Sequence, residues 1–140
     1  GVTQIPQFAY AELVNLIGKV FEEILLRTVG KPALFLKFNS LPLNNATDGV
    51  RLTGVVVPFG LIYEVTDVDT VYTGTGSYRV KIRESSQFED YDLIENTATD
   101  IHWSGHQLLD SGSELIITQG ATVSGTGNID GRIGGRVYKR

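Results

Sequence analysis

Apolar and polar positions divide the chain into a helical N-terminal part and a longer part with the pattern of strands. Between residues 7 and 29 no proline interrupts the chain, and apolar side chains recur three or four residues apart. They are Leu13, Leu16, Ile17, Val20 and Ile24, with Val14, Phe21 and Leu25 widening the same face. Pro6 suits a first helical turn, and Gly30 followed by Pro32 is a common helix end. The spacing therefore predicts one long helix over residues 7–29.

This helix has a wide apolar face, which must be buried against other residues on more than one side. The cover could come from a β-sheet of its own domain or from copies of the helix in an oligomer. We expect the first, because helices commonly pack on the sheet of their own domain. Gly18 lies inside the helix at a cost of about 1 kcal/mol relative to alanine, and could allow another element to approach closely.

From residue 33 onward the pattern changes to short strands. Apolar or alternating runs cover residues 34–38, 50–57, 61–65, 70–72, 77–83, 101–103 and 114–118, with turn clusters at 44–49 and 73–76. In the run 77–83, apolar and basic side chains alternate, which is typical of a half-buried antiparallel strand. Ser104 and Gly105 are expected to end the strand that begins at Ile101. Residues 85–99 are polar and acidic and indicate a long loop or a weak strand pair.

The C-terminal residues 119–140 are rich in glycine. Apolar residues fall at Ile117, Val123, Ile129, Ile133 and Val137, with Gly, Ser, Thr and Asn between them. This Gly-rich sequence predicts either very short strands joined by tight turns or an extended arm. An arm would find its hydrogen-bond partners by adding a strand to a neighbouring subunit. We expect the arm.

Together these patterns predict a mainly β (α+β) fold. We expect an antiparallel β-sandwich or open barrel of about seven to nine short strands, capped by the helix. Residues 1–140 would form a single domain, with an N-terminal arm at 1–6, the helix at 7–29, a β-domain at 33–118 and the Gly-rich segment at 119–140. The length of 140 residues, with 41% hydrophobic and 20% charged residues, fits one folded domain.

The amino-acid composition excludes most kinds of catalytic and metal-binding sites. The chain has no Cys and two His, so thiolate ligands and a Cys nucleophile are excluded. His102 and His106 are four residues apart, and on a strand they would lie about 13 Å apart, too far for one ion. Asp100 and Asp110 could complete a metal site only if the chain turned at Gly105. We therefore expect no metal.

Other catalytic arrangements are also incomplete. Asp67 and Asp69 have the spacing of calcium ligands, but the downstream Gly and Glu of a calcium-binding loop are missing. There is no Gly-x-Ser-x-Gly motif, and the Gly-rich turn at 73–76 is not followed by the Gly-Lys of a phosphate loop. We expect a protein that is not an enzyme and has no cofactor.

Charge is divided unevenly along the chain, whose net charge is −4. Residues 84–114 contain eight acids and no Lys or Arg, whereas the last eleven residues contain four basic residues and one acid. This division is either a matter of solubility or a means of steering docking between subunits or onto a larger surface. The predicted partner-binding residues are Arg132, Arg136, Lys139 and Arg140 on the basic side and Glu89, Asp90 and Asp92 on the acidic side.

The same data bear on the kind of partner. The chain as a whole is not basic, which argues against nucleic acid. No apolar run approaches the roughly 18 residues of a membrane span, and no signal peptide is recognisable. A sugar-binding face is open as an alternative, since six aromatic residues could stack on sugar rings or could be ordinary sheet residues. They are Tyr63, Tyr72, Tyr78, Phe88, Tyr91 and Trp103.

The small Cys-free chain, with one helix, many short strands and the Gly-punctuated text of residues 120–133, resembles virion structural proteins of tailed phages. The closest types are capsid decoration (cement) proteins and small tail or fibre modules. The resemblance implies a homo-oligomer, with a trimer favoured, that is assembled in the host cytoplasm and seated in the virion on a major capsid or tail protein. Residues 1–6 and 131–140 would bridge subunits. The alternative is a carbohydrate- or receptor-binding β-module of a tail fibre or adhesin.

Overall fold

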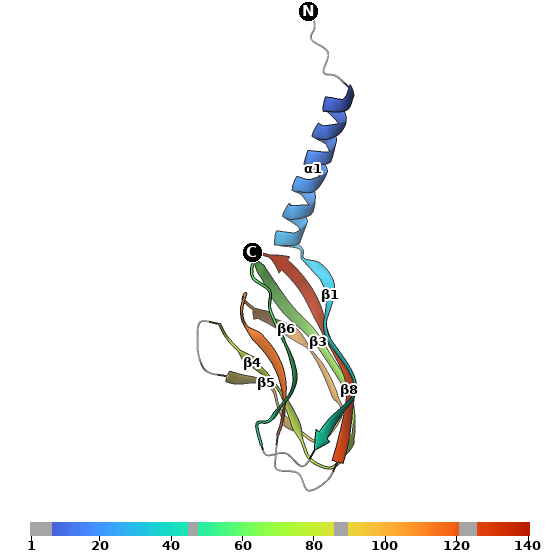
Figure 1. The fold of residues 1–140 in the computed structure, drawn as a ribbon, viewed down its shortest axis with the longest axis vertical. Coiled ribbons are helices and arrows are strands. Elements are labelled where there is room, and N and C mark those ends of the chain that lie inside the picture. The colour runs from blue at the N-terminus through green and yellow to red at the C-terminus, as the bar shows by residue number, and fades with distance from the viewer. Residues whose placement is uncertain (1–6, 45–47, 86–89, 121–125) are drawn as a thin grey trace, which may run out of the picture.

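The computed structural model describes residues 7–44, 48–85, 90–120 and 126–140. A helix, α1 (Gln7–Thr28), precedes all the strands. The strands are β1 (Lys31–Asn44), β2 (Arg51–Val56), β3 (Leu61–Gly74), β4 (Tyr78–Arg83), β5 (Asp90–Thr97), β6 (Ile101–Leu109), β7 (Glu114–Gln119) and β8 (Thr126–Lys139). Figure 1 shows the strands as two facing layers, with α1 projecting from one end of the sandwich.

The strands form two four-stranded antiparallel sheets. Sheet A has the order β1-β8-β3-β6, and sheet B has the order β2-β7-β4-β5. The first strand thus pairs with the eighth, the second with the seventh, the third with the sixth and the fourth with the fifth. This is the strand topology of a jelly roll, an eight-stranded sandwich of two Greek keys. The prediction of a mainly β antiparallel sandwich with one N-terminal helix is confirmed.

The core lies between the two sheets and is supplied by the strands together with Val57, directly after β2. In β4 the side chains of Tyr78, Val80 and Ile82 are fully buried, as the alternation in the sequence predicted. Facing side chains from sheet A include Val65, Val68, Ile129 and Ile133, all fully buried. The Tyr78 hydroxyl donates to the Thr99 carbonyl over 2.7 Å and shares a hydrogen bond of 2.6 Å with the Thr70 hydroxyl. Its polar end is therefore satisfied inside the core.

The prediction of an extended C-terminal arm is wrong. Residues 126–139 form β8, which is hydrogen-bonded to β1 on one side and to β3 on the other. The glycines allow this position because the backbone of β3 approaches β8 closely. A Cβ at Gly135 would overlap the carbonyl oxygen of Glu64, and one at Gly131 would lie 2.5 Å from the carbonyl oxygen of Asp69. The Gly-rich sequence therefore belongs to a central strand whose neighbour lies too close for larger side chains.

Three strand boundaries also differ from expectation. Residues 61–65 and 70–72 belong to one long strand, β3, because a register shift between Val65 and Asp67 absorbs the irregularity. β6 does not end at Ser104 and Gly105 but continues to Leu109, and the Trp103 ring occupies the space beside Gly105. The acidic segment contains a strand, β5, paired with β4.

The expectation that the helix caps the sandwich or packs on its sheet is wrong. Figure 1 shows α1 pointing away from both sheets, with only its C-terminal end beside β1 and β8. No helix in the described part of the chain combines the length and the apolar character needed to cross a membrane. The described part of the chain thus leaves the apolar residues of α1 without cover.

Candidate functional site

The apolar side of α1 is the most unusual surface of the described chain. Nine large apolar side chains on the helix each leave between 47% and 61% of their area exposed. They are Tyr10, Leu13, Val14, Leu16, Ile17, Val20, Phe21, Ile24 and Leu25, called here the apolar face of α1. Val29, directly after the helix, is equally exposed.

The size of this face is that of a protein interface. A helix of 22 residues is about 33 Å long. Half-exposed side chains of this kind leave on the order of 400 Å² of apolar area in water. A standard interface contributes about 800 Å² per partner, of which somewhat over half, about 450 Å², is non-polar. The apolar face alone therefore matches the non-polar part of one such interface.

In the described part of the chain, α1 lacks the packing of an apolar face that stabilises most helices in proteins. Most helical stability in proteins comes from packing an apolar face against other residues and not from intrinsic helix propensity. Gly18 weakens it further, and a Cβ at that position would meet nothing within 4 Å inside the chain. Uncovered, α1 would lose both its apolar burial and part of its helicity.

The C-terminal end of α1 is attached to sheet A by polar contacts. Glu23 forms an ion pair with Lys139 of β8, whose hydrogen bond and positive charge lower the pKa of the Glu23 carboxyl. The Arg136 guanidinium donates to the carbonyl oxygens of Val29 and Gly30, over 3.4 and 3.3 Å. Gly30 has a φ of +75°, and the ring of Tyr138 fills the space beside it. These contacts set the direction in which α1 leaves the sandwich.

The basic residues predicted to bind a partner are engaged within the chain. Arg132 lies 3.6 Å from Asp67, Arg136 and Lys139 hold the end of α1, and Arg140 lies 3.1 Å from Asp110. None of the four is part of a free tail. Arg132, Arg136 and Lys139 lie in β8, an interior strand of sheet A, and the Arg140 backbone N–H donates to the Gly60 carbonyl oxygen over 2.8 Å. Their role toward another molecule stays a prediction.

The predicted acidic residues lie elsewhere. Asp90 pairs with Arg83 across β5 and β4 at 2.7 Å, and the hydrogen bond from Arg83 lowers the pKa of Asp90. Asp92 is exposed and stands opposite Lys81 in the same strand pair. Glu89 lies outside the described residues. The structure thus places Asp90 and Asp92 in sheet B and the basic residues beside sheet A, in different layers of the sandwich.

Both histidines lie on the exposed side of β6 and contact separate carboxylates. His102 Nδ1 is 3.3 Å from Asp69 Oδ1, and His106 Nδ1 is 3.5 Å from Glu64 Oε2. Among the residues that the structure describes, no group of three or more His, Cys, Asp or Glu could hold a metal ion. The two rings therefore contact different carboxylates, Asp69 and Glu64.

The aromatic residues considered for sugar binding do not form a shared exposed face in the described chain. Tyr78 is fully buried, and Tyr72 donates its hydroxyl to the Gly76 carbonyl over 2.9 Å. Tyr63 stacks on Phe35 with 4.1 Å between ring centroids. Tyr91 and Trp103 also pack against the core. Phe88 lies outside the described residues.

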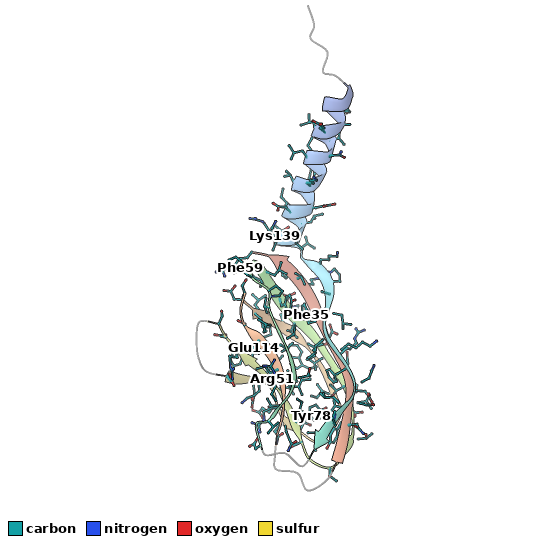
Figure 2. All side chains as sticks on the ribbon, in the orientation of Figure 1. Phe35, Arg51, Phe59, Tyr78, Glu114 and Lys139 are labelled. Carbon is teal, nitrogen blue, oxygen red and sulfur yellow. The ribbon has the colours of Figure 1, made fainter. Side chains whose placement is uncertain are left out.

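Two further exposed apolar side chains lie at the end of the sandwich that carries α1, and nothing in the sequence pattern distinguished them. Phe59 is 98% exposed at the tip of the turn between β2 and β3, and Figure 2 shows it at the same end as Lys139. Leu108 of β6 is 59% exposed. Leu108 lines a groove with Arg27, Ile62 and Tyr138. Their exposure depends on which strand ends meet α1, which no local pattern encodes.

No protein-family model matches the chain, and neither a curated protein nor a solved structure matches it. Function is therefore inferred from the residues and their arrangement. The apolar face of α1 carries that inference, since it is the largest feature that the single chain leaves unexplained.

Proposed function

We propose that the chain is a non-enzymatic structural protein of a virion, of the capsid-decoration type, which works as a homo-oligomer assembled through α1. The carrying observation is the apolar face of α1, whose side chains remain about half exposed in the single chain. Copies of the same helix offer matching apolar faces, and closed symmetric assemblies are the commonest oligomers of soluble proteins. In such an oligomer each helix carries one sandwich at its C-terminal end.

The virion part of the proposal is supported by pattern and topology together. The chain resembles phage virion proteins in its Cys-free, strand-rich text, and its strand order is that of a jelly roll. Jelly rolls recur in viral capsid domains, although the same fold also serves lectins and cupins, so the fold alone does not decide function. The helix distinguishes an assembly role from that of an isolated binding domain.

The acidic edge of sheet B is the candidate contact with a major capsid or tail protein. β5 is an edge strand, and Asp90, Asp92 and Glu95 are exposed on it. Charges on an edge strand prevent unspecific strand pairing and leave the edge available for a complementary basic surface. In this arrangement the helices hold the copies together and the sandwiches contact the shell.

Sedimentation equilibrium of the purified chain tests the oligomer. We expect a defined multiple of the chain mass at micromolar concentration. Ile17→Asp places a charge on the apolar face and should give monomers, whereas Asn15→Asp places the same charge on the polar side and should leave the oligomer intact. A monomeric wild-type chain, or an oligomer that survives Ile17→Asp, contradicts assembly through α1.

The location is tested on virus particles. Particles produced from the genome that carries the coding sequence are purified and analysed by quantitative mass spectrometry. We expect the chain in a fixed ratio to the major capsid or tail protein. Absence from purified particles, with the chain present in the cell lysate, would refute the virion assignment while leaving the oligomer untouched.

A further inference from the structure

Apolar side chains of α1 repeat every seven residues, which is the spacing of helices that wrap around one another. Tyr10, Ile17 and Ile24 occupy one set of equivalent positions, and Leu13 and Val20 occupy the set three residues later. Polar residues recur on the opposite side at the same interval, and these are Glu12 with Lys19 and Asn15 with Glu22. The helix thus has a continuous seam suited to other helices.

The width of the apolar face indicates three helices rather than two. Val14 and Phe21 flank the seam on one side and Leu16 flanks it on the other, and all three are about half exposed or more. In a two-stranded coil these flanking positions lie at the rim and commonly carry charges. β-branched side chains at both seam positions, as at Ile17 and Val20, also favour assemblies larger than dimers.

The seam continues from the helix onto sheet A. Arg27 is the next seam position after Ile24, and it lines one groove with Ile62, Leu108 and Tyr138. These three residues lie on the side of sheet A that faces away from sheet B, where Leu108 is 59% exposed. One seam position of α1, Arg27, therefore adjoins this patch of sheet A.

From this continuity we infer that three copies of the chain associate through a parallel bundle of α1, and that the interface continues onto Ile62, Leu108 and Tyr138. The inference rests on the homo-oligomer part of the proposed function. A parallel bundle brings the three sandwiches to one end, where the patch of each copy meets its neighbours. An antiparallel arrangement would carry the patches to opposite ends and leave them exposed.

The charges around the patch suit contacts between copies. The groove is bordered by Arg27 and Lys139, which are basic, and by Glu64, which is acidic. Glu23 lies at the same end of α1, beside Lys139. Opposite charges around an apolar centre are the usual arrangement of an interface rim, and they favour one register of the copies over others.

Disulfide trapping tests the orientation, because the natural chain has no Cys. Tyr10→Cys places one thiol in the seam near the start of α1. In a parallel bundle this thiol meets its equivalent in another copy, and mild oxidation should give cross-linked pairs on a non-reducing gel. Asn15→Cys, on the polar side, is the control and should remain uncross-linked. An oligomer in which Tyr10→Cys also fails to cross-link overturns the parallel arrangement.

Sedimentation equilibrium of the full chain tests the number of copies and the extension onto sheet A. We expect three times the chain mass for the wild type. Leu108→Asn should weaken association by about tenfold, whereas Val71→Asn should change it by less than about twofold. Val71 is a matched control because it is equally exposed on β3 but lies toward the end of the strand remote from α1.

The possible outcomes separate this inference from the proposed function. A monomeric wild-type chain refutes both. A stable dimer or tetramer leaves assembly through α1 standing and overturns the three-helix bundle. A trimer that Leu108→Asn does not weaken overturns the continuation onto sheet A. Trp103 fluorescence confirms that each variant keeps a folded sandwich.

Discussion

Single residues in β8 show how a sequence signal can be visible and still be misinterpreted. The glycines of residues 126–139 are close together in the sequence, which is the usual composition of a flexible segment. In the structure Gly131 and Gly135 lie where the β3 backbone approaches too closely for any side chain. The sequence reports that glycine is present, and only the neighbouring strand reveals why.

We expect Gly135→Ala to lower the free energy of unfolding of the sandwich by about 1–3 kcal/mol, because its Cβ would overlap the Glu64 carbonyl oxygen. Urea denaturation followed by Trp103 fluorescence measures this. The control is Gly18→Ala, where a Cβ would meet nothing within 4 Å. That control should leave the sandwich unchanged and favour the helix by up to about 1 kcal/mol. Equal urea midpoints for Gly135→Ala and the wild type would contradict the close approach.

Tyr78 allows a prediction about pH. Burial raises the pKa of its hydroxyl, with the hydrogen bond from Thr70 opposing part of that rise. Above about pH 10 the unfolded chain therefore releases a proton that the folded chain retains, so stability falls as pH increases. Tyr78→Phe should lower the free energy of unfolding at pH 8 by about 1–3 kcal/mol, through its two lost hydrogen bonds.

The difference between Tyr78→Phe and the wild type should narrow above about pH 10, because the variant has no hydroxyl to ionise. Urea titrations of both proteins at a series of pH values measure this difference. If the two stability curves stay parallel through the alkaline range, the hydroxyl does not contribute to the alkaline loss of stability.

Among the elements, those with a strong local period were predicted well. α1 ends at Thr28 instead of residue 29, and β4 and β7 have nearly the expected bounds. Elements without a regular alternation of apolar and polar residues were predicted poorly. The strand β5 lies in a mostly acidic part of the sequence, and β6 continues through Ser104 and Gly105. β5 takes its strand conformation from hydrogen bonds to β4, the strand directly before it, and β6 takes its conformation from hydrogen bonds to β3, which is distant in sequence.

The core contains residues of the strands and none of α1, so the sandwich should fold without the helix. We expect a chain that begins at Gly30 to unfold at nearly the same urea concentration as the sandwich of the full chain, since it loses surface contacts such as that of Glu23 with Lys139. Urea denaturation measures this, and sedimentation should show a monomer. A chain without α1 that is insoluble or unfolded would show that the helix supports the core.

The whole molecule has two parts with different sources of stability. The sandwich buries its own core, whereas the side chains on the apolar face of α1 are about half exposed in the single chain. The sequence pattern of α1 is compatible with packing on the domain's own sheet and with packing on other copies of the helix, and we expected the first. A sequence pattern shows that a face needs cover but contains no information on where the helix points relative to the sheets.

This division predicts two thermal transitions. Association stabilises only the state that binds, so the helix should melt at a temperature that rises with protein concentration. The sandwich should melt at a temperature that does not depend on concentration. Far-ultraviolet circular dichroism follows the helix and Trp103 fluorescence follows the sandwich. One shared transition, independent of concentration, would contradict separate sources of stability.

The sequence by itself determined the class of the protein: a helix from its three- and four-residue period, strands from alternation, and little equipment for thiol or metal chemistry from composition. These properties are local or additive, so they can be read without a fold. The tertiary structure decided that β8 is a central strand, that Arg132, Arg136, Lys139 and Arg140 pair within the chain, and that α1 projects with its apolar face exposed. Those properties depend on contacts between residues far apart in sequence, which periodicity does not record.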